Sequence, residues 1–170
     1  MGREIRRVPK NWQHPINEEC RHWGVDPHRG LPCYKPMHDQ DYKSAATEWM
    51  ANYQRFQDAT PEERAKEFSK YCEYYWEYDS PPDEELYRPV FDGPADCYQI
   101  YETVSEGTPV SPVFETQEEM IEWLVSEGHS RKSAEAFVKD GWAPSLVVFR
   151  SGGDVEILTG VDAADKWKEE

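Results

Sequence analysis

Long apolar runs are missing from this sequence. No stretch approaches the ~20 consecutive apolar residues that a membrane-spanning helix needs, and mean hydropathy is low at -0.92. No apolar segment follows the arginines near the N-terminus, which argues against a secretory signal. We therefore expect a cytoplasmic protein without a membrane partner. Its four widely spaced cysteines form no Cys-x-x-Cys pair and would then be reduced thiols: Cys20, Cys33, Cys72 and Cys97.

Basic residues are scarce. Nineteen Lys and Arg stand against 34 Asp and Glu, so the net charge is -15. A strongly negative surface is repelled by nucleic-acid backbones and anionic membranes and attracted to basic protein surfaces. Nucleic acid is therefore an unlikely partner by charge, and a basic protein a suitable one. Only the first eleven residues reverse the sign, with Arg3, Arg6, Arg7 and Lys10 against Glu4.

The familiar catalytic motifs are absent as well. The sequence has no G-x-S-x-G elbow, no P-loop, no H-E-x-x-H and no dinucleotide fingerprint. No cofactor is therefore predicted, and no enzyme class is indicated. The Pro- and Gly-rich stretch 14–38 contains residue types that can bind a metal, namely His14, Cys20, His22, His28, Cys33 and His38. Structural zinc sites use tighter Cys or His pairs, so this spacing favours no metal site.

Aromatic residues, in contrast, are plentiful at 14% of the chain. Each buries a large area, so a folded core can form from few side chains. We expect an α+β protein that forms one compact domain, with an irregular N-terminal arm and loop over 1–40, a helical hairpin over 41–82 and a small α+β region over 83–170. Five prolines between residues 9 and 36, together with Gly24 and Gly30, are the reason for expecting irregular structure there.

The helical hairpin is predicted from apolar spacing and a cap. Residues 41–58 have apolar side chains at helical spacing. Thr60-Pro61-Glu62-Glu63 has the pattern of a capping box and opens a second helix. We expect that helix to continue to Ser80 with one face turned inward, formed by Ala65, Phe68, Cys72, Tyr75 and Trp76.

The C-terminal half alternates strand and helix signals. Residues 97–104 are β-rich and 105–112 are turn-prone. Thr116 and Ser130 cap two short helices that end at Gly128 and Gly141. A hairpin over 146–159 turns at Gly152-Gly153. We expect strand 97–104 and this hairpin to form one small antiparallel sheet.

Three segments, and the short stretch Tyr34-Lys35-Pro36-Met37, resemble a group of uncharacterised bacteriophage and prophage proteins. They are the opening Arg6-Arg7-Val8-Pro9-Lys10-Asn11-Trp12-Gln13-His14-Pro15, the central Tyr101-Glu102-Thr103-Val104-Ser105-Glu106-Gly107-Thr108-Pro109-Val110-Ser111-Pro112-Val113-Phe114, and the late Gly141-Trp142-Ala143-Pro144-Ser145. The resemblance covers the two ends of the chain better than its middle. It implies a phage origin and a host-cell cytoplasm, and it implies no chemistry.

The most promising binding segment is acidic and aromatic. Residues 58–87 contain ten acids and three bases, and five of the eight residues 71–78 are aromatic. Exposed tyrosines among carboxylates suit an interface with a basic protein. The predicted partner-binding residues are Glu73, Tyr74, Glu77, Tyr78 and Asp79. The alternative interpretation is a solvated acidic helix whose tyrosines pack within the domain.

The leading hypothesis is thus a phage-encoded binding protein that engages a basic surface of a host protein. The host protein would be a nucleic-acid-handling enzyme or an antiviral defence component. In one version of the hypothesis, the carboxylates of this chain imitate a phosphate backbone. A virion or assembly protein without catalysis is another alternative.

The rival from a different class is a binder of a small, nucleotide-like ligand, or an enzyme, that uses the 101–109 loop. Its candidate residues are Arg6, Arg7, Tyr101, Glu102, Ser105, Glu106, Thr108 and Trp142. Arginines beside aromatic rings have the residue types for phosphate contact and base stacking. The competing interpretation of residues 105–109 is a turn that leaves a strand.

Overall fold

The computed structural model describes residues 2–17, 32–103, 107–151 and 154–166. Helices and a small antiparallel sheet make up the structure, so the predicted α+β class is confirmed. Two compact units divide the chain. One, here called the sheet unit, combines Met1–Pro36 with Phe91–Glu170, and the other, the helical unit, spans Met37–Val90. Among the described residues, no helix is both long and apolar enough to cross a membrane.

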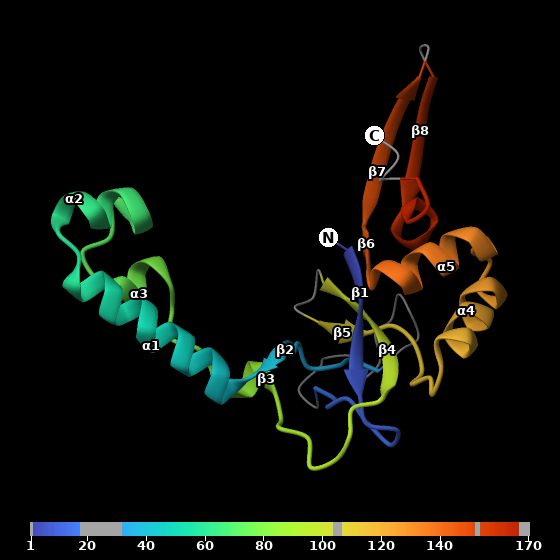
Figure 1. Ribbon diagram of the computed structural model, residues 1–170, viewed down its shortest axis with the longest axis horizontal. Coiled ribbons are helices and arrows are strands. Elements are labelled where there is room, and N and C mark those ends of the chain that lie inside the picture. Colours follow the sequence, from blue (N-terminus) through green and yellow to red (C-terminus); the bar gives the residue numbers. More distant parts are fainter. Residues whose placement is uncertain (1, 18–31, 104–106, 152–153, 167–170) are drawn as a thin grey trace. The chain divides into compact units, whose positions relative to one another are not determined.

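The sheet unit is built on four antiparallel strands in the order β5-β4-β1-β6 (Figure 1). They are β5 (Thr108–Pro109), β4 (Cys97–Glu102), β1 (Gly2–Val8) and β6 (Trp142–Pro144). The expectation of an irregular N-terminal arm is wrong, because β1 pairs with β4 on one side and with β6 on the other. The charged residues of β1 obscure the alternation of polar and apolar side chains by which a strand is predicted. In the structure, Arg6 and Arg7 lie against aromatic rings of β4.

Helices α4 (Gln117–Ser126) and α5 (Arg131–Asp140) supply most of the remaining core of this unit. Both begin at the predicted caps. Thr116 Oγ1 accepts a hydrogen bond from the Glu119 amide, and Ser130 Oγ accepts one from the Ser133 amide. Helix α5 ends at Gly141, whose φ of 74° favours glycine. The core side chains come from both helices and from β4, namely Ile100, Met120, Leu124, Ala134 and Phe137.

The predicted C-terminal hairpin forms from β7 (Leu146–Ser151) and β8 (Asp154–Thr159). The expectation that it joins the strand at 97–104 is wrong, because β7 and β8 form a two-stranded sheet of their own. The hairpin runs outward from β6, and the 3-10 turn η4 (Gly160–Ala163) follows at its base (Figure 1). Its predicted turn residues, Gly152 and Gly153, lie outside the described residues.

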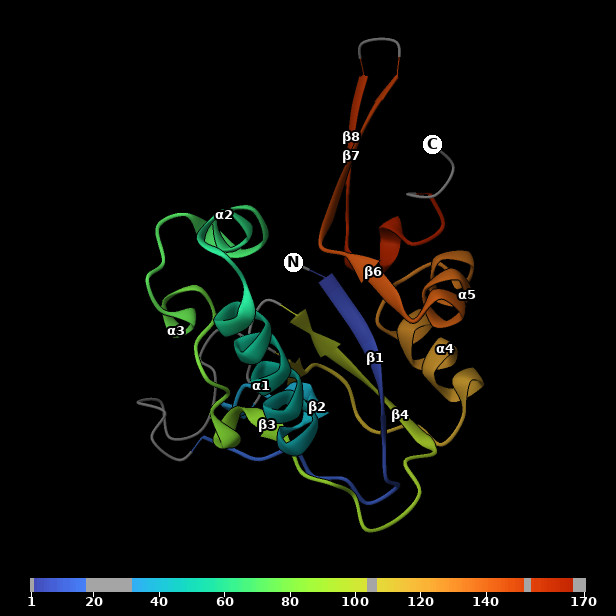
Figure 2. The same cartoon turned by 60° about the vertical axis from the view of Figure 1, so that its left-hand side comes forward.

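The helical unit has one long helix and several short ones (Figure 2). The order is β2 (His38–Asp41), α1 (Tyr42–Asp58), α2 (Pro61–Arg64), the π-helix η1 (Ala65–Ser69), α3 (Tyr75–Tyr78), the 3-10 turn η2 (Glu84–Leu86) and β3 (Tyr87–Arg88). The first helix and the capping box at Thr60 and Glu63 are as predicted.

The second helix of the hairpin is shorter than predicted. Its helical turns end at Ser69, and a new helix, α3, begins at Tyr75. The reason is local: the Glu77 carboxylate accepts hydrogen bonds from the amides of Glu73 and Tyr74, at 2.8 and 3.1 Å. Amides capped by this side chain start a helix instead of continuing one.

Candidate functional site

Aromatic rings form the core of the helical unit. Phe56 and Tyr75 are buried there, and Phe68 contacts both rings with centroid distances of 5.3 and 5.8 Å. Trp49 also contacts the Tyr75 ring, and it stacks on Tyr53 with the two ring centroids 5.4 Å apart. This cluster determines which rings of the 71–78 stretch are available to a partner.

Tyr75 is tied to the end of α3. Its hydroxyl donates to Asp79 Oδ2 at 3.0 Å, while the Asp79 carbonyl oxygen accepts from Trp49 Nε1 at 2.9 Å. Burial, followed by the hydrogen bond and charge of Asp79, raises the pKa of Tyr75 to about 12. Asp79 is therefore engaged within its own unit, so it is a weaker contact candidate than its neighbours.

Four other rings of the segment are exposed. Tyr71, Tyr74, Trp76 and Tyr78 are 84, 45, 47 and 49% exposed. The prediction that Trp76 faces inward with Tyr75 is wrong. Instead it stacks on Tyr74, with ring centroids 4.7 Å apart and planes 8° from parallel. Because the helix restarts at Tyr75, that ring alone of residues 71–78 is buried, and Tyr78 packs against the edge of the cluster, with its centroid 5.6 Å from that of Phe68. Two stacked rings are left outside it.

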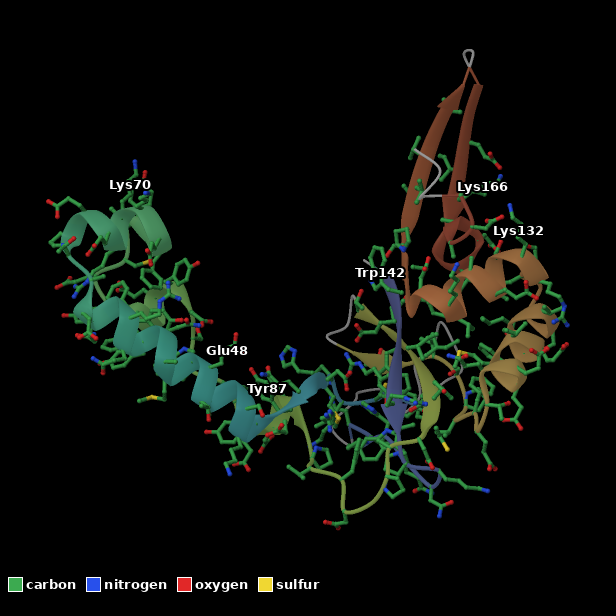
Figure 3. The ribbon with its side chains drawn as sticks, in the orientation of Figure 1. Glu48, Lys70, Tyr87, Lys132, Trp142 and Lys166 are labelled. Atoms are coloured by element: carbon green, nitrogen blue, oxygen red, sulfur yellow. The ribbon has the colours of Figure 1, made fainter. Side chains whose placement is uncertain are left out.

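The charges around these rings have one sign. Between Lys70 and Arg88 the sequence contains six acids and no base. Figure 3 labels Lys70 and Tyr87 near the two ends of this stretch. Glu73 is exposed, and Glu77 is exposed as well although its carboxylate caps α3. Residues 71–79, here called the acidic aromatic segment, thus contain all five predicted partner-binding residues together with Tyr71 and Trp76.

The residues predicted for a small ligand are placed differently. Tyr101 and Arg6 are buried, and the Arg6 guanidinium lies 4.4 Å from the centroid of the Tyr101 ring. Arg6 also pairs with Glu4 at 2.6 Å. Arg7 lies over the Tyr98 ring, with its guanidinium carbon 4.2 Å from the centroid. Both arginines therefore pack against tyrosine rings of the sheet and contribute to its structure.

Other members of that set are spread out. Thr108 pairs with Glu102 where β5 meets β4. Trp142 is on β6, at the opposite edge of the sheet, where it packs close to Gly2 (Figure 3). Ser105 and Glu106 lie outside the described residues. The structure thus does not bring the described members of this set into one site.

A buried polar network surrounds the Tyr101 hydroxyl. This oxygen accepts from Trp12 Nε1 at 3.0 Å and donates to Gln99 Oε1 at 2.8 Å. Gln99 Nε2 in turn donates to the Ser111 carbonyl oxygen at 2.9 Å. The chain of bonds joins the opening segment to the central one, which are almost ninety residues apart. Sequence spacing gave no sign of it.

His14 completes this network. Its Nε2 lies 2.7 Å from the Lys35 carbonyl oxygen and its Nδ1 lies 3.3 Å from the Tyr101 hydroxyl. Burial lowers the pKa of His14, and the positive charge of Arg6 lowers it further, while the Lys35 carbonyl acts in the opposite direction. The neutral imidazole is therefore the form that this environment favours.

A pocket of about 650 Å³ opens beside the network. Its lining is rich in aromatic and proline side chains and includes Trp12, His14, Tyr34, Gln99, Pro109, Val110, Trp123 and Glu127. None of the described residues that line it is Lys or Arg. This composition suits a ring-shaped or aliphatic ligand better than a phosphate, which usually requires basic side chains or helix N-termini.

The cysteine and metal predictions concern residues 14–38. Cys33 is disulfide-bonded, so the expectation that all four cysteines are thiols is wrong for Cys33, whose bonding partner lies outside the described residues. Cys72 and Cys97 are free. Within the described ranges, no group of three or more His, Cys, Asp or Glu residues could hold a metal ion. Cys20, His22 and His28 lie outside them.

We compared the chain with protein-family models, with curated proteins and with solved structures, and none of them matches.

Proposed function

We propose that this chain is a binding protein that engages a basic protein surface through its acidic aromatic segment. One observation carries the proposal: the stacked pair Tyr74 and Trp76 is exposed in a stretch of chain with six acids and no base. Tyr and Trp are the side chains that most often dominate binding energy at protein interfaces. Stacking also restrains the two rings, which lowers the entropy cost of binding.

Charge and rings have separate tasks in this proposal. An exposed ion pair contributes only ~0–1 kcal/mol, so no single carboxylate holds the partner. Together the acids of residues 71–87 attract a basic surface and accelerate encounter in a salt-dependent way. The rings then supply affinity, because truncating a central aromatic anchor can cost ~2 kcal/mol or more.

The origin and the partner belong to the same proposal. The resemblance to phage and prophage proteins supports a partner in the host cell, such as a nucleic-acid-handling enzyme or a defence component, met in the host cytoplasm. Disulfides are rare in that compartment, so the bond at Cys33 gives an independent check. Thiol alkylation in rapidly quenched infected cells should label Cys33 if the protein works there, and failure to label it would place the protein in an oxidising environment.

The test compares the proteins that bind the parent chain with those that bind a variant without the two stacked rings. Tagged parent chain is incubated with lysate of the host bacterium at low and at high salt. Proteins retained by the parent are compared with those retained by Tyr74→Ala/Trp76→Ala. We expect a basic protein that the parent retains at low salt and the double variant loses. With that protein purified, the double variant should bind at least about tenfold more weakly, equivalent to ~1.4 kcal/mol.

Charge is tested separately. Glu73→Lys should slow association and leave dissociation almost unchanged, and added salt should reduce the difference. Asp92→Lys is the matched control, because Asp92 is an exposed acid of the sheet unit. If Glu73→Lys and Asp92→Lys behave alike and the ring variant still binds, the acidic aromatic segment is not the interface.

The pocket beside His14 supports a second candidate, the binding of a small molecule. Its volume of about 650 Å³ and its ring-rich lining are suitable for a compact ligand, and the absence of Lys and Arg among its described lining residues favours an uncharged or cationic one over a nucleotide. Native mass spectrometry of the purified chain tests this. We expect a bound mass that Val113→Trp, which fills the pocket, removes and that Asp92→Lys retains. A parent chain without any bound mass would contradict this candidate.

A further inference from the structure

A small pocket in the helical unit combines acids with aromatic rings. It has a volume of about 150 Å³ and lies where α1, β3 and the end of the acidic aromatic segment meet. Figure 3 labels two of its lining residues, Glu48 on α1 and Tyr87 on β3. Pockets for drug-sized molecules measure about 300–1,000 Å³. This one, here called the Glu48 pocket, is therefore the size for a single side chain.

Two carboxylates give the Glu48 pocket negative charge. Burial raises the pKa of Tyr87, and the charges of Asp79 and Glu48 raise it further, so both carboxylates lie near the Tyr87 hydroxyl. Asp79 is held in place, because its Oδ2 accepts a hydrogen bond from the Tyr75 hydroxyl at 3.0 Å. A carboxylate offers about four acceptor positions, so Asp79 can accept further bonds. Two like charges repel each other, and a cation between them relieves that repulsion.

The neighbouring bases are engaged elsewhere. Arg88, the next residue of β3, forms an ion pair with Asp39 at 3.2 Å, and Arg55 forms one with Glu67 at 3.1 Å. The His38 ring packs against the tyrosine ring of the pocket, with centroids 4.9 Å apart. No Lys, Arg or His is among the described residues that line the pocket. The described lining therefore supplies negative charge without a cation of its own.

Aromatic rings add a second attraction for a cation. Trp49 and Tyr87 both line the pocket. Trp49 is restrained by stacking on Tyr53 and by the bond from its Nε1 to the Asp79 carbonyl oxygen, at 2.9 Å. Ammonium and guanidinium groups are attracted to ring faces, and to Trp most strongly. A pocket with carboxylates and rings therefore suits the end of a Lys or Arg side chain.

We propose that the Glu48 pocket binds one Lys or Arg side chain of the basic protein partner. The inference rests on the proposed function, and it names the side chain that the partner supplies. Asp79 belongs both to the pocket and to the acidic aromatic segment, so one partner surface can reach both. Neither Tyr74 nor Trp76 lines the pocket, so the two contacts can be removed separately.

A titration of the purified full chain tests the pocket without the partner. The probes are N-acetyl-arginine amide and N-acetyl-lysine amide, added over ~0.5 to ~50 mM, a range that brackets millimolar Kd values. The readout is the indole N–H resonance of Trp49, identified by its loss in Trp49→Phe. We expect both cations to shift this resonance to saturation. The neutral isostere N-acetyl-citrulline amide, and NaCl at equal concentration, should not.

A matched pair of variants locates the binding. Glu48→Gln should weaken probe binding about fivefold, the upper end of what one exposed ion pair contributes. Glu62→Gln is the control, because Glu62 is an exposed glutamate of α2 in the same unit that does not line the pocket. It should bind the probes as the parent does. Circular dichroism checks that both variants are folded.

Three results would overturn the proposal. They are a parent chain that neither cation saturates, a citrulline probe that binds as well as the arginine probe, and a Glu48→Gln variant that binds as the parent does. The ring variant Tyr74→Ala/Trp76→Ala should bind both probes normally. If that variant also retains the basic protein from lysate, the proposed interface fails while the cation pocket stands, so the two failures are distinguishable.

Discussion

Buried side chains are spread over a sheet and two helices in the sheet unit, whereas in the helical unit they gather at one aromatic cluster. The sheet unit buries Ile100, Leu124 and Phe137 on three different elements. The helical unit, all of whose residues are described, buries few apolar side chains, and only Phe56 and Tyr75 among them are large rings. A core with so few members depends strongly on each of them.

Charge is distributed unequally as well. The helical unit has thirteen acids and six bases, a net charge of -7 in 54 residues, and the sheet unit has -8 in 116 residues. Repulsion among like charges opposes compaction, and a small core offsets it only partly. The comparison teaches that the unit with the more acidic surface is also the one whose stability depends on fewer contacts.

The largest effect should come from removing a ring from each core. Phe56→Ala should cost about 3–5 kcal/mol, the range for a buried Phe, and so should Phe137→Ala. The helical unit buries only Met37, Ala45 and Tyr75 besides Phe56, so we expect this loss to unfold it. Hydrogen exchange should therefore show α1, α2 and α3 unprotected in Phe56→Ala while β1 and β4 stay protected. Phe137→Ala should show the reverse. Equal loss of protection in both units by either variant would contradict their separate cooperativity.

The next largest effect should come from the buried polar network of the sheet unit. Tyr101→Phe removes the hydroxyl that Trp12 donates to and that donates to Gln99. Three side-chain groups, on Trp12, His14 and Gln99, then lose a partner, so the free energy of unfolding should fall by about 1–3 kcal/mol. Chemical denaturation measures it. Tyr71→Phe in the helical unit is the control, because Tyr71 is 84% exposed; its effect should stay within about 0.5 kcal/mol.

Helix caps allow a matched pair across the two units. Thr60 and Thr116 both form capping boxes, with Glu63 and Glu119. Each Thr→Ala substitution should cost about 1 kcal/mol. Thr116→Ala should lower the global unfolding midpoint, because α4 contributes Met120 and Leu124 to the core, while Thr60→Ala should expose only amides near α2 to exchange. Thr47→Ala, within α1, is the control and should be neutral. A global loss in Thr60→Ala would show that α2 supports more than its own turn.

The smallest effect is a pH dependence specific to the sheet unit. His14 has a pKa lowered below the ordinary value of 6.5, mainly by burial. The unfolded chain therefore takes up its proton first as the pH falls, so stability is full above about pH 6.5 and decreases below it. His14→Gln should flatten this decrease between about pH 7 and pH 5 in urea titrations. A parent and a variant with parallel slopes would show that the imidazole does not contribute.

Some features of this protein could be predicted from the sequence because their causes are local. The capping boxes at Thr60 and Thr116, the cap at Ser130 and the glycine end at Gly141 each depend on atoms within four residues. The 41–58 helix and the 146–159 hairpin follow from apolar spacing over one element. The α+β class follows from the order of such elements.

Other features depended on which distant segments meet. The residues of β1 are mostly polar or charged, and they form a central strand only because β4 supplies Tyr98 and Tyr101 for Arg7 and Arg6 to lie on. The exposure of Trp76 follows from the Glu77 cap, which restarts the helix so that Tyr75 alone of the 71–78 segment is buried. The Trp12–Tyr101 bond and the pocket beside it join segments that are far apart in the sequence.

The physical reason is the range of the interactions. A cap or a turn is decided by hydrogen bonds that close within a few residues, so residue types and spacing are enough to predict it. Strand order, the side on which a ring is buried and the assembly of a pocket depend on free energies of burial between surfaces that the sequence alone does not pair. The sequence by itself therefore determined where the helices and turns of this protein begin and end, and only its tertiary structure decided which of its many aromatic and charged side chains remain available to bind.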